Sequence, residues 1–577
     1  MTSRLNPFLI AAAVGIPAAA VAAPHVDTML VRDGYDAGET RRDEDGRDRP
    51  RRAVYPGGEQ AQLAQLASGE ILMFGMGSYR LNGELPNHRN QMFCASIKMD
   101  PVLGPQLQNL KYVTNNQGDR YRNAHHPRVT PIFNGEAVAV TYNYAPNNHA
   151  YAYQLVFGPN CEQLSERTRI VAKNNDNCSE TGQHPEIVTY QDATTTRLFS
   201  AHGCNGNGSD DSWAAITEIR KNPDGTYTVE KITDDIRTER EEERSRPDVL
   251  ATNIPDLAVV CLTAGNTQPP NRGVYCSGYD TQTGEQLWRM AVAKKEDGIY
   301  RTQIRATPIL DAAGNPTNKA YVTWQELTKR RRKEKGTAKM MASVISYDRN
   351  GMSIEAVPQT DIFPGGDATH ASQCSTLWGE DGAAESRMVL ISGSINGNAS
   401  ALSTAHVVGW NDLERKLTHV RKIGLAAAID TGWLSNLYGE NPTTQGRNYI
   451  QCIGNVRNPG YGVTGGYQPD VRSFVAIAAH TRRIDPTTGA PEEKLATELV
   501  LIPAVTAPAA TLPPDEPNND PDPEPEPEPN PEPQPDPDPA PTPTADMAGC
   551  STTGTTSGAA TALLVALALG LPRRRRR

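Results

Sequence analysis

Helical periodicity is what this sequence of 577 residues lacks most clearly. No long segment places apolar residues at the helical period of 3.6. Between about Ala53 and Val505, apolar and β-branched runs alternate instead with clusters of Gly, Pro, Asn and Asp. The absence of helical segments over such a length predicts one large all-β architecture rather than several small domains.

Motifs of specific chemistry are lacking as well. None of the nine cysteines lies in a C-x-x-C pair, so a zinc site of that spacing is not indicated. No good Asp box (S-x-D-x-G-x-T-W) is present, and no quinone- or metal-binding set stands out. The sequence therefore assigns no catalytic residue.

Eight of the nine cysteines lie in the body of the chain, and Cys550 lies alone in the tail. An even number in an exported body predicts disulfides, although eight cysteines allow 105 pairings. Cys261 and Cys276 flank a single Pro/Gly turn, which should place them on neighbouring strands. They are the disulfide pair that the sequence supports best.

Basic residues are absent from Asp515 to Asp538, a stretch that contains ten acidic residues. That stretch accounts for the net charge of −10, so the rest of the chain is close to neutral and no nucleic-acid partner is indicated. The basic run at 329–335 fits nucleic acid or heparin. Its place between two strand-like segments favours a solvated loop.

The N-terminus predicts export. Residues 1–22 combine Arg4, an apolar stretch from Phe8 to about Ala20, and a small-x-small cleavage site at 20–22, which together are typical of a signal peptide. A membrane anchor is the alternative, but the apolar stretch is short.

A spacer is predicted at 506–548, where proline takes nearly every second position from Pro513 onward. Such a sequence forms neither helix nor sheet, and its carboxylates repel one another. At about 3.1 Å per residue, some thirty residues would hold the body on the order of 90 Å from an anchor.

The last segment, 549–577, holds Cys550, an apolar run from about Ser557 to Leu571, and five arginines at its end. The run is slightly short for a membrane span and reaches the lower length limit only with the preceding threonines. The arginines favour a cytoplasmic end. Together with the spacer, the segment resembles the MYXO-CTERM sorting signal of myxobacterial and related surface proteins.

That resemblance implies that a membrane protease removes the helix, that Cys550 carries a lipid, and that the protein sits on the outer-membrane surface. The sorting protease and the export machinery would be its partners. An ordinary C-terminal transmembrane anchor is the alternative, and in both cases the body faces outward.

The body, 53–505, is repetitive. Seven segments, each a strand, a turn and an apolar strand, begin about 60 to 80 residues apart, and a second hairpin follows each of them. A four-stranded unit repeated seven times is typical of a β-propeller, in which radial packing buries both faces of every sheet. A pair of β-sandwiches is the alternative.

The segment 23–52 contains a strand-like stretch, His25 to Tyr35, that could complete the last blade of such a ring. One outer hairpin, Tyr279 to Trp288 (YDTQTGEQLW), resembles those of quinoprotein-type propellers. There the Asp, Thr-Gly and Trp form a tight turn and pack neighbouring blades. The resemblance supports the fold and not a dehydrogenase.

Polar side chains stand where several repeats begin. Because first strands line the central channel of a propeller, imidazoles and guanidiniums at these positions would converge on an anion, and imidazoles alone would suit a transition metal. The alternative is that they only satisfy loop carbonyls. The residues are His125, His126, His184, Arg246, Arg305 and His370.

No cofactor is predicted outright, but a Gly-rich loop offers four oxygen donors that would suit calcium. Turn chemistry alone also favours Asn and Asp. The donors are Asn205, Asn207, Asp210 and Asp211.

Two functions remain open. The spacer and anchor favour a surface-displayed binding module for adhesion, for a matrix polymer or for another protein. The alternative is a surface glycan hydrolase or lyase, which needs paired carboxylates. Glu186 and Asp248, each after a proline that opens a repeat, are the only carboxylates in register.

Overall fold

The structure is a computed structural model. It describes residues 27–36, 40–42, 48–50, 59–77, 91–100, 104–113, 123–145, 151–171, 177–180, 186–205, 210–233, 236–239, 247–267, 270–327, 338–359, 368–379, 384–394, 404–424, 429–430, 450–457, 471–484 and 491–506. For some residues near strand ends only the backbone is described.

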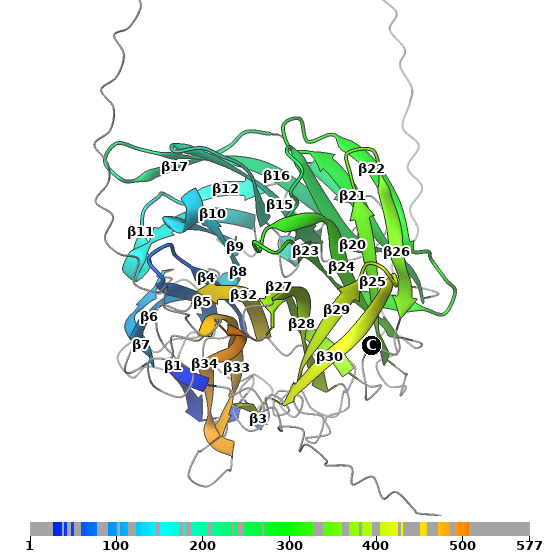
Figure 1. Cartoon of the computed structure of the whole chain (residues 1–577). Coiled ribbons are helices and arrows are strands. Elements are labelled where there is room, and N and C mark those ends of the chain that lie inside the picture. The colour runs from blue at the N-terminus through cyan, green and yellow to red at the C-terminus, as the bar shows by residue number, and fades with distance from the viewer. Residues whose placement is uncertain are drawn as a thin grey trace, which may run out of the picture. The chain divides into compact units, whose positions relative to one another are not determined.

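Seven antiparallel sheets follow one another along the chain, and the first strand of each contacts the first strand of the next around a closed ring. Figure 1 shows first strands such as β8, β23 and β32 around the middle and outer strands such as β17 and β30 at the periphery. The predicted all-β, seven-bladed propeller is confirmed. Apart from two single 3₁₀ turns, the described residues contain no helix.

The first four blades run from Glu59 to Ala293. Their strands are β4 (Glu59–Gln65), β5 (Ile71–Gly77), β6 (Gln91–Asp100) and β7 (Gly104–Tyr112) in blade 1; β8 (Asn123–Ile132), β9 (Ala137–Ala145), β10 (Tyr151–Gly158), β11 (Glu162–Gln163) and β12 (Thr168–Val171) in blade 2; β13 (Asn177–Glu180), β14 (Glu186–Gln191), β15 (Thr195–Asn205), β16 (Asp210–Lys221), β17 (Tyr227–Lys231) and β18 (Ile236–Glu239) in blade 3; and β19 (Asp248–Leu250), β20 (Leu257–Thr267), β21 (Pro270–Asp280) and β22 (Gln286–Ala293) in blade 4.

The last three blades complete the ring. Their strands are β23 (Tyr300–Leu310), β24 (Pro316–Leu327), β25 (Ala338–Tyr347) and β26 (Met352–Gln359) in blade 5; β27 (Ala368–Trp378), β28 (Glu385–Ser394), β29 (Thr404–Asn411) and β30 (Lys416–Gly424) in blade 6; and β31 (Ile429–Asp430), β32 (Ile450–Arg457), β33 (Val471–Ile484) and β34 (Pro491–Thr506) in blade 7. A separate ribbon pairs β2 (Thr40–Arg42) with β3 (Asp48–Pro50).

The two ends of the body meet in blade 7. Strand β1 (Asp27–Asp36) pairs antiparallel with β34, with Asp27 opposite Leu501. The expected closing strand at His25 to Tyr35 thus has its counterpart in β1. The last sheet is thus built from both ends of the body, and β1 covers the outer edge of β34.

Alternation of side chains along each strand builds the core. Successive residues of a strand point to opposite faces, and in a propeller each face packs against another blade. Blade 3 shows this clearly: Leu198 packs toward blade 2, whereas its neighbour Phe199 packs toward blade 4. The apolar clusters of the protein are accordingly seams between consecutive blades.

Three disulfides are described. Cys261 and Cys276 are cross-strand neighbours on β20 and β21 and are bonded, as the sequence predicted. The other two join different blades: Cys94 of blade 1 bonds Cys161 before blade 2's outer strands, and Cys374 of blade 6 bonds Cys452 of blade 7. The second and third bonds therefore strengthen the ring itself.

The hairpin from Tyr279 to Trp288 behaves as its resemblance implied. Asp280 Oδ1 accepts the backbone N–H groups of Gln282 and Thr283, both at 2.9 Å, and Gly284 takes a positive φ of 77°. Trp288 Nε1 donates to the carbonyl of Asp348 in blade 5 at 2.9 Å. The tight turn and the tryptophan thus join two neighbouring blades.

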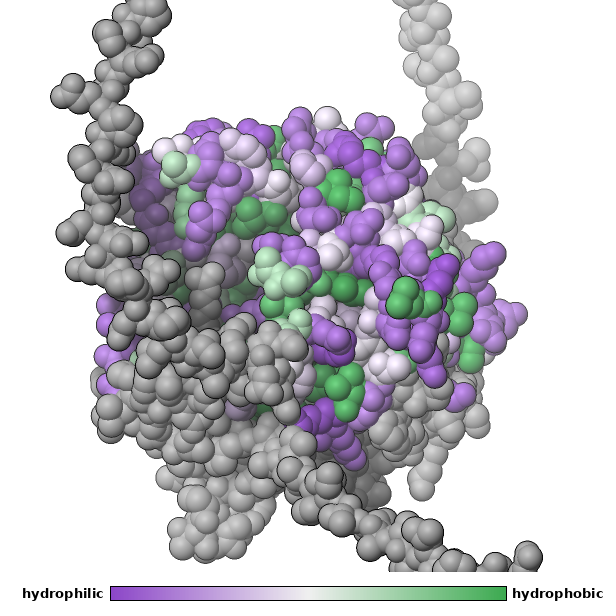
Figure 2. Space-filling model, in the orientation of Figure 1, coloured by the Kyte–Doolittle hydropathy of each residue, from purple (hydrophilic) through white to green (hydrophobic). Residues whose placement is uncertain are grey.

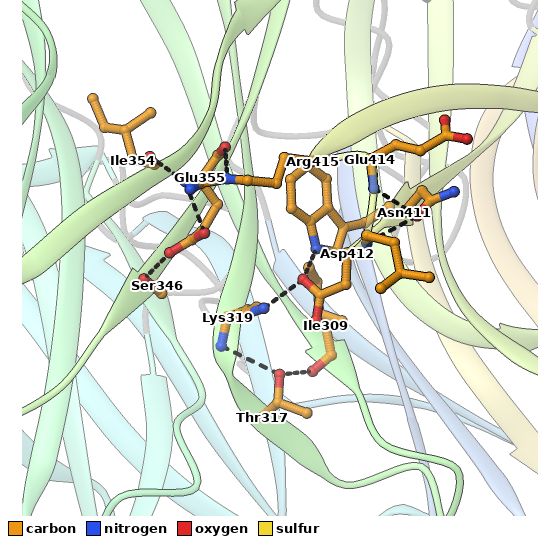
Figure 3. Close-up of polar contacts among 12 residues, drawn as sticks. Ile309, Thr317, Lys319, Ser346, Ile354, Glu355, Asn411, Asp412, Glu414 and Arg415 are labelled. Atoms are coloured by element: carbon orange, nitrogen blue, oxygen red, sulfur yellow. Dashed lines mark hydrogen bonds and ion pairs between the residues drawn. The ribbon is translucent and has the colours of Figure 1, made fainter.

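The outer parts of blades 5 and 6 are joined by polar contacts (Figure 3). Lys319 Nζ lies 2.5 Å from Asp412 Oδ1, and Arg415 pairs with Glu355 at 3.0 Å. These residues come from strands and turns of two sheets, so the contacts fix the sheets to each other at the rim, where water competes and each pair adds little.

The surface carries no large apolar patch that the described residues form. Their exposed large apolar side chains are spread over five blades. In Figure 2, hydrophilic residues cover much of the described surface in view, and apolar residues appear as separate small areas.

Several predictions concern residues outside the described ones: the signal peptide at 1–22, nearly all of the spacer at 506–548, and the tail at 549–577 with Cys550. The basic run at 329–335 also lies outside them. In the part of the chain that the structure describes, no helix is long and apolar enough to cross a membrane.

Candidate functional site

A cavity of about 490 Å³ lies among the first strands of blades 7, 1, 2 and 3. It follows the second halves of β4, β8 and β32 and the turns after β4 and β8, and β14 lines it along its length. Its polar lining residues are Gln62, Gln65, Arg128, Thr130, Asn134, Glu186, Gln191 and Asn455.

The floor and the rim of this cavity differ in character. Gln62, Arg128 and Glu186 are buried, each no more than 5% exposed, whereas Asn134 is exposed and Gln191 is partly exposed. The cavity thus leads from an accessible, uncharged rim to a floor that holds one guanidinium and one carboxyl group.

Glu186 is fixed by blade 2 although it belongs to blade 3. Its Oε2 accepts hydrogen bonds from Thr141 Oγ1 and, at 2.7 Å, from Gln154 Nε2. Its Oε1 has no partner among the described residues. Burial raises the pKa of Glu186 from 4.5 to about 7, and the hydrogen bonds from Thr141, Thr130 and Gln154 offset only part of that effect.

Arg128 stands beside a buried histidine. It lies on β8, its Nη1 donates to the carbonyl of Pro127 at 2.8 Å, and its charge acts on His202. Burial first, and then Arg128, lowers the pKa of His202 from 6.5 to about 3, so that the imidazole is neutral at ordinary pH.

The amides at the rim are held in place. Gln191 Nε2 donates to Asn134 Oδ1 at 2.9 Å, and Gln191 Oε1 accepts the backbone N–H of Phe133 at 2.5 Å. Asn455 Oδ1 accepts the backbone N–H of Leu377 at 2.9 Å. Because these bonds fix the oxygens, the NH₂ groups of Asn134 and Asn455 keep defined positions at the cavity.

An amide-rich lining suits a ligand with many hydroxyl groups. Each amide both donates and accepts, as a hydroxyl group does, so amides can pair with hydroxyls in either direction. One buried carboxyl that is half protonated near neutral pH adds a group that can give a proton to such a ligand.

The residues predicted at the channel mouth are only partly described. His125 and His126 lie in β8 and His370 in β27, without described side chains, and His184 and Arg246 lie outside the described residues. Whether these five converge on an anion thus stays a prediction.

Arg305 is the one member of that set whose side chain is described. It lies on β23, is 8% exposed, and its Nη1 donates to the carbonyl of Ile304 at 2.6 Å. It is not among the residues that line the cavity, whose strands belong to other blades.

The two carboxylates in register turn out to differ. Glu186 lines the cavity, whereas Asp248 is fully buried on β19, where its Oδ2 accepts the backbone N–H of Ala306 in blade 5 at 2.9 Å. Asp248 therefore joins blades 4 and 5, and the two carboxylates do not flank one cavity.

The candidate calcium donors lie at the end of the hairpin of β15 and β16. Asn205 pairs with Asp210, and Asp211 is one residue further, opposite Cys204; Asn207 lies outside the described residues. The backbone thus brings three donors close in register, without described side chains. No group of three His, Cys, Asp or Glu side chains able to hold a metal is found among the described residues.

Sequence reasoning missed the amides and Arg128. A signal was available, since HPR, HPE and RPD open three consecutive repeats and place Arg128, Glu186 and Asp248 directly after proline. All three side chains are buried in the structure, at 5%, 5% and 0% exposure. In these three repeats, the position directly after the proline therefore carries a buried polar group.

Comparison with known proteins gives likenesses of structure only. No family model matches the sequence, and no curated protein matches it. An α-L-arabinofuranosidase from Fusarium graminearum, in complex with an iminosugar inhibitor, is 9% identical and has a TM-score of 0.38; 83% of this chain and 98% of that chain are covered.

Two further solved structures are similar to the same degree. An α-L-arabinanase from Penicillium chrysogenum with arabinobiose is 11% identical, with a TM-score of 0.37 and coverage of 65% of this chain and 92% of that one. The NanB sialidase from Streptococcus pneumoniae is 9% identical, with a TM-score of 0.38 and coverage of 83% and 70%. Glycoside hydrolases are thus among the structural neighbours of this propeller, and at these values the likeness says nothing about activity.

Proposed function

We propose that this propeller acts on a glycan, which it binds in the cavity among blades 7, 1, 2 and 3. The carboxyl group of Glu186 carries the proposal. It lies on the floor of the cavity, its pKa is raised to about 7, and amides that suit sugar hydroxyls line the way to it.

Glu186 would act as the proton donor. Cleavage of a glycosidic bond needs a carboxylic acid that is still protonated near neutral pH, and burial is the usual means of keeping one so. Thr141 and Gln154 hold one carboxyl oxygen, which fixes the orientation of the group. Amides at the rim would hold a sugar ring through its hydroxyls.

Binding without turnover is the second candidate, and one observation favours it. Hydrolysis by the usual route takes two carboxyl groups about 5 to 9.5 Å apart. Among the described residues, Glu186 is the only carboxyl group that lines the cavity, and Asp248 is engaged elsewhere. A surface module that recognises a glycan needs the amides alone.

One experiment separates the two. The intact protein and its Glu186→Gln variant are incubated with a panel of polysaccharides, with release of reducing ends or unsaturated products as one readout and calorimetric binding as the other. Product from the parent protein, lost in Glu186→Gln while binding persists, supports the enzyme. Binding without product from either protein supports the module, and neither binding nor product rejects the cavity as a glycan site.

Asp248→Asn is the matched control. Asp248 is also a buried carboxyl in register on a first strand, and an amide oxygen can still accept the N–H of Ala306. This variant should keep the product yield and the affinity of the parent protein.

We also propose that the protein is exported and displayed on the cell surface by its tail. The sequence features at 1–22, 506–548 and 549–577 support this. Cys550→Ser should release the protein from the surface while the propeller stays folded, as fractionation and protease protection would show. A variant that stays at the surface with its tail uncleaved would reject the sorting signal.

A further inference from the structure

The seam between blades 2 and 3 contains buried polar atoms that have no partner among the residues that the structure describes. Among the described residues, eight such atoms belong to six side chains that face this seam: Asn143 Nδ2 and Oδ1, Gln154 Oε1, Glu186 Oε1, Ser200 Oγ, His202 Nδ1 and Nε2, and Thr217 Oγ1. All six residues are at most 5% exposed. We call this set the polar belt.

The strand pattern places these side chains on one seam. On β9, Ala137 and Ala139 pack toward blade 3, and Asn143 follows on the same face by alternation. On β15, Leu198 packs toward blade 2, and Ser200 and His202 follow on the same face. Ser200 is also the cross-strand neighbour of Glu186.

Apolar clusters close the belt on two sides. One contains Ala139, Val156, Leu198 and Ile219, which precede the belt residues along β9 and β15 and follow them along β10 and β16. The other contains Ala152, Trp213 and Ala215, which precede the belt residues along β10 and β16, together with Ile170 of β12. The belt is therefore a polar stripe enclosed within a packed interface.

So many unpaired atoms in one enclosed place would be very costly if the seam were dry. Each buried polar group without a hydrogen bond costs about 1–3 kcal/mol, and native proteins keep few of them. Buried waters meet about three otherwise unsatisfied groups each, so eight atoms suit a cluster of about three waters.

We propose that the polar belt binds a cluster of ordered waters, which reaches the carboxyl of Glu186 from the side of the seam. Glu186 is the only belt residue that also lines the cavity. The belt atoms can supply both donors and acceptors to water: the amide of Asn143 offers one of each, and the neutral imidazole of His202 does the same.

With water in the belt, the carboxyl group of Glu186 can exchange a proton with that water as well as with a ligand in the cavity. After Glu186 has given its proton to a ligand in the cavity, a water molecule of the belt can pass a proton to the carboxylate and receive one from the next water. The last water of the chain takes its proton from bulk solvent, so that one net proton enters and no belt side chain changes its charge. This role, unlike the water cluster itself, rests on the proposed glycan activity.

A crystal structure of the intact protein at high resolution, without any glycan, tests the cluster directly. Ordered waters within hydrogen-bond distance of Asn143, Ser200 and His202 are expected. If the crystal structure shows no ordered water in the seam, and these side chains form hydrogen bonds with one another, the proposal is overturned.

Thr217→Val tests it by stability. In a hydrated belt, the hydroxyl is bonded to water, so its loss should shift the unfolding equilibrium toward the unfolded state by up to about tenfold, or 1.4 kcal/mol. In a dry belt, the loss of an unpaired hydroxyl should stabilise the protein, which would contradict the proposal.

Thr323→Val is the matched control. Thr323 is buried in the seam of blades 5 and 6 and donates directly to Gln373 Oε1 at 2.5 Å. Its replacement removes this direct hydrogen bond and should destabilise the protein whether or not water is present in the other seam.

Ser200→Ala tests the proton role. If the parent protein cleaves a glycan, this variant should lower kcat several-fold and leave KM unchanged, because Ser200 does not line the cavity. An unchanged kcat, with waters present in the crystal, would overturn the role and leave both the cluster and the glycan activity standing.

Discussion

Blade 3 presents two different faces to its neighbours. Toward blade 4, Phe199, Ala201, Ala214 and Ile216 pack on aliphatic residues of β19 and β20, with Tyr279 beside them. Toward blade 2, the same two strands, β15 and β16, carry the polar belt. One face of this sheet is thus packed with apolar side chains, whereas the other carries buried polar side chains.

The comparison also extends across the ring. In the seam of blades 5 and 6, the buried amide of Gln373 is satisfied at both ends: its oxygen accepts from Thr323, and its nitrogen donates to Thr307 at 3.1 Å. A buried polar group is thus not unusual in this propeller. What distinguishes the seam of blades 2 and 3 is that, among the described residues, eight of its buried polar atoms have no hydrogen-bond partner.

The largest effect is expected on the apolar face. Phe199→Ala removes a fully buried ring that lies 5.7 Å from the ring of Tyr279, centroid to centroid. The free energy of unfolding should fall by about 3–5 kcal/mol, because a cavity is left in a packed seam. Denaturant titration measures it, and a loss below about 1 kcal/mol would mean that this face is not the tightly packed one.

The polar face should show its own dependence on pH. The folded-state pKa of Glu186 is raised from 4.5 to about 7, so its contribution to stability is complete below pH 4.5 and is lost as the pH rises through 7. The stability of the parent protein minus that of Glu186→Gln should therefore fall by roughly 3 kcal/mol over this range. A difference that stays constant would show that the carboxyl is not desolvated.

His202 gives the opposite dependence of folding stability on pH. Its folded-state pKa is lowered from 6.5 to about 3, so its contribution is complete above pH 6.5 and is lost as the pH falls through 3. Between pH 4.5 and 6.5 the two residues offset each other in the parent protein. His202→Gln should accordingly make stability fall with rising pH already from pH 4.5, as thermal unfolding across that range would reveal.

A smaller effect separates the two ways of removing the Glu186 carboxyl group. Glu186→Ala leaves the Thr141 hydroxyl and the Gln154 amide without their acceptor and should cost about 1–3 kcal/mol at pH 5.5. Glu186→Gln keeps an acceptor oxygen and should cost less. Equal losses in both variants would contradict the hydrogen bonds assigned to this carboxyl.

The smallest effect is expected for a residue that lies on neither face of the sheet of blade 3, and it serves as a reference for the variants above. Asp224 is exposed in the turn between β16 and β17, where its Oδ1 accepts the backbone N–H of Thr226 at 3.0 Å. Asp224→Ala should lower the midpoint of thermal unfolding less than any variant above. A larger loss would mean that the turn, and not the seams, governs the stability of blade 3.

Much of the fold could be predicted from the sequence, because the fold rests on local patterns that recur. Alternating runs fix strands, the recurrence fixes the number of blades, and the turn between Cys261 and Cys276 fixes their pairing. Ring closure by β1 followed from the need to cover an edge. None of these inferences required knowledge of which side chains meet across a seam.

The site could be predicted only in part. Glu186 was recognised from its place after the proline, but the cavity lies along the second halves of β4, β8 and β32, away from the strand starts on which the prediction concentrated. Periodicity gives the face on which a side chain stands. It does not give the end of the channel at which the first strands of several blades leave a cavity between them.

The closing strand bears on how the protein would carry mechanical load. Strand β34 ends at Thr506, a few residues before the proline-rich stretch that begins at Pro513. It is flanked by β33 on one side and by β1 on the other. A pull transmitted along the chain beyond Thr506 would load β34 lengthwise, so that the ladders on both sides resist in shear and share the force. If the body is tethered through this end of the chain, the pairing of β1 with β34 would then also oppose forced unfolding of the last strand.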